Sequence, residues 1–149
     1  GFENAYFDRV APFMGIRETR RLVGEYILTE QDIFDCAKFD DSIAVSAYPV
    51  DQHHPVGGDC TLMWCPDCHD IPYRSLLPKK IDSLIVAGRC ISATHLALAS
   101  VRVMGPAMAT GEAAGKAAAL SVKYNVQLRD LDVAALQTAL REEGVYLRD

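Results

Sequence analysis

The sequence lacks both a long apolar run and an excess of basic residues. No window reaches the roughly 18 uncharged apolar residues that a membrane-spanning helix requires, so no membrane partner is expected. The formal net charge of −5 argues against a general nucleic-acid surface, which needs a basic stripe. A signal-peptide pattern is also missing. These absences favour a globular protein of the cytoplasm with about one domain's worth of residues.

Cysteine is present, but without a disulfide framework. The five cysteines are an odd number with irregular spacing, which predicts free thiols in a reducing, cytoplasmic setting. The first residue is Gly rather than Met, and the opening residues do not resemble the start of a protein. We therefore expect the chain to be a piece of a longer protein.

Apolar and β-branched runs predict three strands. They cover residues 16–29, 42–50 and 83–88. The second is ended by Pro49. The third is closed by Gly88 and has the continuous apolar character of a strand buried on both faces. Such a strand is typical of an α/β fold, which is the expected fold class, with α+β expected for the isolated fragment.

One short helix and a long loop are expected between these strands. Thr29 is a helix cap, with Asp32 at the third helical position. Residues 51–78 are rich in Pro, Gly, Cys and His and are interpreted mostly as loop. A short extended piece is expected at 60–64.

A helix of small side chains follows a loop over residues 89–105. Pro106 suits its first position, and the helix is expected to run to about Tyr124. At 100° per residue its inward face is predicted to comprise Ala107, Thr110, Gly111, Ala114, Ala118 and Ser121. Such a face buries little apolar area, so its use is close approach of the backbone, either to a sheet or to a ligand. A last helix starts after Asp132 and stops at Gly144.

The first turn of the small-residue helix is a predicted anion site. Its N–H groups and positive dipole end follow a strand and its loop. Arg89 and Arg102 lie in this loop. Arg89 can neutralise a phosphate or pair with a carboxylate. Arg102 can face a ligand or fix its own loop through hydrogen bonds to carbonyls.

Residues 84–120, LIVAGRCISATHLALASVRVMGPAMATGEAAGKAAAL, resemble the C-terminal signature of FAD-dependent oxidoreductases of the two-dinucleotide-binding-domain type, distantly like fumarate reductase flavoproteins. Three further segments match the family and occur in the order expected of it. They are IRETRRLVGEYILTEQDI, IPYRSLLPKKIDSLIVAGR and, more weakly, ALREEGVYL. The resemblance implies that residues 81–149 are the last strand and C-terminal helices of a Rossmann-like FAD domain. Residues 1–80 are then a β-rich segment of the substrate domain.

The G-x-G-x-x-G turn that holds the FAD pyrophosphate is not in this chain. By the resemblance, the full-length protein is an enzyme and its partners are FAD, a small-molecule substrate and the remainder of its own FAD domain. The fragment alone is expected to be inactive, to hold FAD poorly, and to self-associate through exposed apolar surface at residues 84–87.

The resemblance also implies which residues contact the cofactor. Gly88 and Arg89 are expected near the ribityl and phosphate part of FAD. The helix start is expected at the flavin N1–C2=O edge, where backbone N–H groups of Ala107 and Met108 stabilise negative charge during hydride or electron-pair transfer. The complete expected cofactor-binding set is Gly88, Arg89, Arg102, Gly105, Pro106, Ala107 and Met108.

Catalytic and substrate residues are less well marked. The catalytic residues are not identified, and the weak candidates are Arg102, His53 and His54. Histidine is a common acid–base group near neutral pH, but loop histidines are commonly only solvated. A pocket for an anionic substrate would use Arg17, Tyr73 and Arg74. The presence of Arg17 is explained equally well, without a substrate, by the alternation of charges on a half-exposed strand.

A C-x-x-C motif at Cys65 and Cys68 leaves three interpretations open. It is a plain loop, a redox dithiol, or part of a zinc site in which Cys60 and either His69 or His53 supply the other ligands. The zinc interpretation belongs to an alternative function, a non-enzymatic binding module or zinc-stabilised domain.

Overall fold

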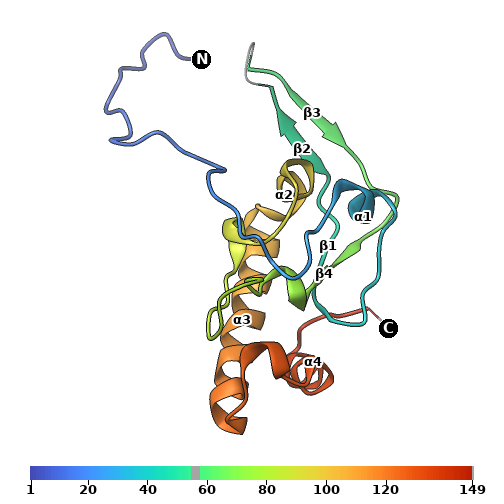
Figure 1. Ribbon diagram of the computed structural model, residues 1–149. Helices are drawn as coiled ribbons and strands as arrows, with labels where there is room; N and C mark the ends of the chain where they lie inside the picture. The colour runs from blue at the N-terminus through green and yellow to red at the C-terminus, as the bar shows by residue number, and fades with distance from the viewer. Residues whose placement is uncertain (55–57, 149) are drawn as a thin grey trace.

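The computed structural model describes residues 1–54 and 58–148 and has a mixed helical and antiparallel-sheet architecture (Figure 1). Three single 3₁₀ turns, η1 to η3, accompany the main elements. In chain order the elements are α1 Glu30–Phe34, β1 Ser42–Ser46, β2 Val50–His53, β3 Cys60–Met63, β4 His69–Pro72, η1 Tyr73–Ser75, η2 Gly88–Cys90, α2 His95–Val101, α3 Met104–Tyr124, η3 Leu128–Asp130 and α4 Val133–Glu142.

The strands form two separate two-stranded sheets. β1 pairs with β4 and β2 pairs with β3, both antiparallel. β1 and β3 confirm the predicted strand near 42 and the extended piece near 60. Most of β2 and all of β4 lie inside residues 51–78, the region interpreted as mostly loop, so that part of the interpretation was wrong. The β4 sequence, HDIP, has a weak strand pattern, and pairing with β1 buries all four residues.

Two predicted strands are not strands in this structure. Residues 16–29 contribute only isolated bridges, from Gly24 to Pro78 and from Leu28 to Ala93. Residues 83–88 are irregular up to η2. A strand needs a paired strand to complete its hydrogen-bond ladder. In the described part of the chain no strand pairs with this segment, although Val86 N–H donates to Leu76 O at 3.0 Å.

Two helix starts, those of α1 and α4, are predicted correctly from their caps. Thr29 and Asp32 form a reciprocal capping box at α1. The Asp132 side chain caps α4 by accepting from the N–H groups of Ala134 and Ala135. α3 begins at Met104, two residues before the position expected from Pro106. α2 was missed, because the Thr94 cap precedes only two turns of helix.

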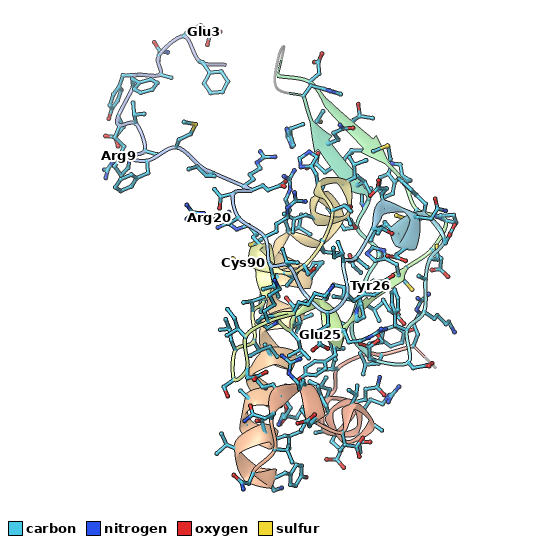
Figure 2. All side chains as sticks on the ribbon, viewed as in Figure 1. Glu3, Arg9, Arg20, Glu25, Tyr26 and Cys90 are labelled. Atoms are coloured by element: carbon cyan, nitrogen blue, oxygen red, sulfur yellow. The ribbon has the colours of Figure 1, made fainter. Side chains whose placement is uncertain are left out.

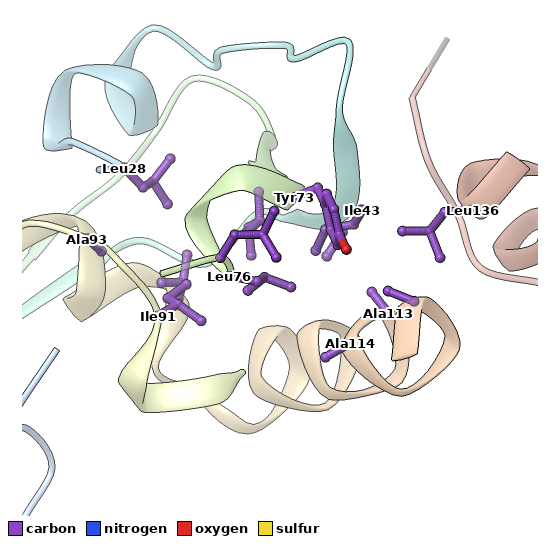
Figure 3. Close-up of a cluster of buried hydrophobic side chains, with 14 of the residues drawn as sticks. Leu28, Ile43, Tyr73, Leu76, Ile91, Ala93, Ala113, Ala114 and Leu136 are labelled. Carbon is purple, nitrogen blue, oxygen red and sulfur yellow. The ribbon is translucent and has the colours of Figure 1, made fainter. Parts of the chain in front are cut away.

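The core lies between α3 and the β1–β4 sheet, with Tyr73 and Leu76 at its centre (Figure 3). The buried face of α3 comprises Pro106, Thr110, Ala113, Ala114, Ala117 and Leu120. Thr110 and Ala114 therefore lie where predicted, but Gly111 is exposed. A side chain added at Gly111 or Gly115 meets no atom within 4 Å. Within the described residues, close packing is achieved by the buried alanines and not by these glycines.

At Gly24, in contrast, the packing leaves no room for a side chain. An added Cβ would lie 2.7 Å from Ser92 Cβ and 3.0 Å from Leu77 O. Gly24→Ala is therefore expected to lower the free energy of unfolding by about 1–3 kcal/mol through overpacking. The matched control is Gly111→Ala on the open face of α3, which is expected to raise it by about 0.5–1 kcal/mol through helix propensity. Urea unfolding of both variants measures the difference, and equal effects would contradict it.

The N-terminal residues form an extended arm that runs away from the helices (Figure 1). Its large apolar side chains are almost fully exposed, among them Phe2, Tyr6, Phe7 and Phe13. No helix in the described ranges has both the length and the apolar character needed to cross a bilayer.

Candidate functional site

A small hollow forms where four distant segments meet near the start of α3. It has a volume of about 180 Å³ and is lined by Arg17, Asp51, Arg89, Arg102 and Val103. Arg17 belongs to the end of the N-terminal arm, Asp51 to β2 and Arg89 to η2. We call it the arginine hollow.

Local structure explains why these side chains converge. Arg102 is the C-cap of α2 and Val103 is the N-cap of α3, so the joint between the two helices forms one wall. Figure 2 shows the arm passing the turn that carries Cys90, where Leu22 N–H donates to Cys90 O at 2.9 Å. This contact positions the arm beside η2.

Each arginine makes one anchoring contact and keeps donors free. Arg102 Nη2 donates to Asp51 O at 2.9 Å, and Arg89 Nη1 donates to Ile16 O at 2.8 Å. Arg17 Nη1 contacts His53 Nε2. A guanidinium has five N–H donors, so each retains donors for a ligand.

Positive charge is in excess at the hollow. Three guanidiniums and one carboxylate line it, and that carboxylate, on Asp51, faces His53 Nε2 at 3.1 Å. Among the described residues no carboxylate lies within ion-pair distance of Arg17, Arg89 or Arg102. Arg102 does bond to a carbonyl, but the acceptor is Asp51 O on β2 and not a carbonyl of its own loop as one alternative expected, and the described residues give Arg89 no salt bridge. An anionic group is the natural complement of this site.

The start of α3 adds backbone donors next to the hollow. The helix begins at Met104, so the N–H groups of Met104 and Gly105 have no acceptor inside it. The Ala107 N–H group was predicted to donate to the flavin. It donates instead to Val103 O at 3.0 Å, inside the helix, and is therefore not free for a ligand. Met108 lies further along α3 with its side chain 73% exposed.

Gly88 joins η2 to α3. Its φ of +66° is a left-handed conformation that glycine adopts without strain. Its N–H donates to Thr110 Oγ1 at 3.0 Å, and an added Cβ would lie 3.8 Å from that of Ala107. Gly88 therefore sets the path of the turn that presents Arg89.

A second, apolar hollow of about 520 Å³ lies on the other side of Val103. Gly105 and Pro106 line it, together with Tyr48 and the exposed Trp64. The expected cofactor-binding set is thus divided. Arg89 and Arg102 line the arginine hollow, and Gly105 and Pro106 line the apolar one.

Other expected site residues lie elsewhere. The prediction that Tyr73 lines a substrate pocket was wrong, because its ring is buried in the core and its hydroxyl donates to Leu128 O at 2.9 Å. Burial raises the pKa of Tyr73 to about 12. The Arg74 guanidinium is engaged by both carboxylate oxygens of Asp41, and it is not among the residues that line the arginine hollow. His54 Nε2 contacts Thr61 Oγ1 across the β2–β3 hairpin.

The cysteine–histidine alternative does not form a metal site in the described residues, where no three His, Cys, Asp or Glu side chains are placed to hold an ion. Cys60 is exposed on β3, whereas His69 is fully buried on β4. Cys65 and Cys68 are both half-buried free thiols.

A family model described as FAD dependent oxidoreductase matches residues 1–140. The chain belongs to this family. No curated protein and no solved structure matches it. FAD is therefore the cofactor of the full-length flavoprotein, as the resemblance implied.

The arrangement of this flavoprotein chain fits such a cofactor in charge. FAD carries two phosphates, and the arginine hollow offers three guanidiniums without a carboxylate partner. Sequence reasoning singled out Arg17, Arg89, Arg102 and His53 separately, and the structure brings them together. It missed Asp51 and Val103, because nothing in their local sequence marks them and only long-range packing places them here.

Proposed function

We propose that this chain forms the C-terminal part of a flavin-dependent oxidoreductase and holds an anionic part of FAD at the arginine hollow. In this assignment residues 81–149 belong to the FAD-binding domain and residues 1–80 to the substrate domain. The observation that carries the proposal is the group of guanidiniums of Arg17, Arg89 and Arg102, which line one hollow and have no carboxylate of the described residues within ion-pair distance.

The chain's own groups have distinct tasks in this proposal. Arg89 and Arg102 neutralise negative charge, and their carbonyl anchors at Ile16 and Asp51 hold them in place before binding. The free N–H groups of Met104 and Gly105, at the positive end of α3, donate to electron-rich atoms nearby. Gly88 keeps η2 close to α3.

When bound, FAD supplies the hydride or electron-pair transfer, and the protein supplies orientation and electrostatics. A small-molecule substrate is the partner, and the apolar hollow beside Val103 borders the same helix start. His53 contacts Arg17 and Asp51, which line the arginine hollow, and is the histidine that we assign as an acid–base candidate there. We assign no proton transfer to His54.

The test is FAD affinity in the full-length protein. Arg89→Gln and Arg102→Gln each remove one charged donor and are expected to weaken FAD binding about 10–100-fold, since a hydrogen bond to a charged group contributes about 1.5–3 kcal/mol. Arg9→Gln removes the same charge from the exposed arm and is the control. Flavin fluorescence during titration of the apoprotein measures the affinity. If both hollow variants bind FAD like the wild type, the proposal fails.

A further inference from the structure

Three of the five cysteines gather where the end of α1 meets the turn before β4. Cys36 follows α1, and Cys65 and Cys68 bracket the turn. Asp67 N–H, within that turn, donates to Cys36 Sγ at 3.2 Å. The Cys36 sulfur therefore lies against the C-x-x-C segment, although the two are about thirty positions apart in the sequence.

The backbones of the two segments are fixed to each other by one guanidinium. Arg148 Nη1 donates to Cys68 O at 2.8 Å, and its Nη2 donates to Cys36 O at 3.1 Å. The Arg148 side chain is only 9% exposed and pairs with the buried Asp70. The approach of the cysteines thus belongs to the rigid part of the fold.

Cys36 occupies a backbone position that ordinarily favours glycine. Its φ is +51°, in the left-handed region, where a side chain with a Cβ is strained. Cysteine at this position supplies a thiol, which glycine would not, and that thiol contacts the turn between Cys65 and Cys68. The left-handed backbone of Cys36 is an observation independent of the hydrogen bond from Asp67.

The thiol of Cys65 responds to this neighbour. Burial is the largest cause that raises its pKa, and the negative charge of the Cys36 thiolate raises it further. A raised pKa keeps the Cys65 thiol less ionised than an ordinary cysteine, and ionised sulfur is the nucleophile in thiol chemistry.

We propose that Cys36 and Cys65 are a modification site that a peroxide converts to an intramolecular disulfide. The Cys36 thiolate attacks one peroxide oxygen, the O–O bond breaks, and hydroxide leaves as water after taking up a proton. This gives a sulfenic acid on Cys36. The Cys65 sulfur then attacks the Cys36 sulfur, the S–O bond breaks, and a second water leaves. The two sulfurs lose two electrons and hydrogen peroxide gains them.

The disulfide would join the end of α1 to the segment that leads into β4. The disulfide uses no residue of the arginine hollow, so a test of the cysteine site does not depend on the proposed FAD contacts.

The experiment treats the native full chain with hydrogen peroxide and maps the products by mass spectrometry. Free thiols of this chain are expected to fall from five to three. Trypsin should release peptide 22–38 linked to peptide 39–74, with loss of two hydrogens. Because Cys60 and Cys68 share the second peptide, variants assign the partner. Cys36→Ser and Cys65→Ser should abolish the link, whereas Cys60→Ser, Cys68→Ser and Cys90→Ser should retain it.

Every other outcome overturns the assignment. A link that survives Cys65→Ser and is lost in Cys68→Ser moves the bond to the other cysteine of the motif. A two-hydrogen loss within peptide 39–74 that persists in Cys36→Ser shows a Cys65–Cys68 disulfide instead. Unchanged Cys36 and Cys65 thiols at peroxide concentrations that oxidise the exposed Cys90 show that the site does not react. Circular dichroism of each serine variant before treatment verifies that it is folded.

Discussion

Replacing Arg148 with alanine is expected to lower the free energy of unfolding by about 3–5 kcal/mol, the cost of breaking a buried ion pair from one side. Arg148 Nε and Asp70 Oδ1 lie 2.7 Å apart, and the side chains are 9% and 3% exposed. The variant leaves the Asp70 carboxylate buried without its cation. It also removes the donors to the carbonyl oxygens of Cys36, Ala37 and Cys68.

Two further variants make the Arg148 result specific. Arg148→Lys keeps the charge but cannot reproduce the planar fork, so its stability is expected to lie between those of the wild type and Arg148→Ala. Arg9→Ala removes an exposed arginine, whose partner Asp8 is also exposed, and is expected to change stability little. Urea unfolding followed by circular dichroism measures all three. Similar losses in Arg148→Ala and Arg9→Ala would contradict the interpretation.

Acidification is expected to destabilise the fold through His69 by about 3 kcal/mol between pH 6.5 and pH 4, at about 1.4 kcal/mol per pKa unit. Burial first, and the charge of Arg148 second, lower the pKa of His69 from 6.5 to about 4. The unfolded chain therefore takes up a proton at a pH where the folded chain does not. The stabilisation is complete above pH 6.5 and is lost as the pH falls towards 4.

His69→Phe provides the comparison. The His69 ring is fully buried on β4, and neither ring nitrogen has a hydrogen-bond partner among residues 1–54 and 58–148. At pH 7 the variant is expected to be at least as stable as the wild type, because it removes two unpaired buried polar atoms. Urea unfolding at pH 7 and pH 4.5 then separates His69 from the carboxylates, which titrate in both proteins. Parallel loss of stability in the two proteins would exclude His69 as the cause.

Local signals in the sequence predicted the elements whose ends are set by nearby residues. The Thr29 cap, the Asp132 cap and the Gly144 stop depend on contacts within a few positions, and all three are found. Residues 83–88 show the opposite case. Their apolar pattern is that of a buried strand, but a pattern does not supply the neighbouring strand, and Leu84 is 42% exposed here.

The candidate site was predictable in part for the same reason. Arg89 and Arg102 stand out because they interrupt small and apolar surroundings beside a helix start. Asp51 has no such mark. It reaches the arginine hollow only because β2 lies against α2, and Arg102 then donates to its carbonyl. The error on Tyr73 arose because an aromatic side chain with a hydroxyl suits a pocket and a core equally well.

The position of Arg148 in the chain has a consequence for the order in which the fold assembles. Its hydrogen bonds reach back 80 residues to Cys68 and 112 residues to Cys36. Contacts of such long sequence separation form only after a large loop has closed, which slows folding. During synthesis, α1 and the β1–β4 pair therefore lack the hydrogen bonds of Arg148 until the segment that carries this residue has left the ribosome.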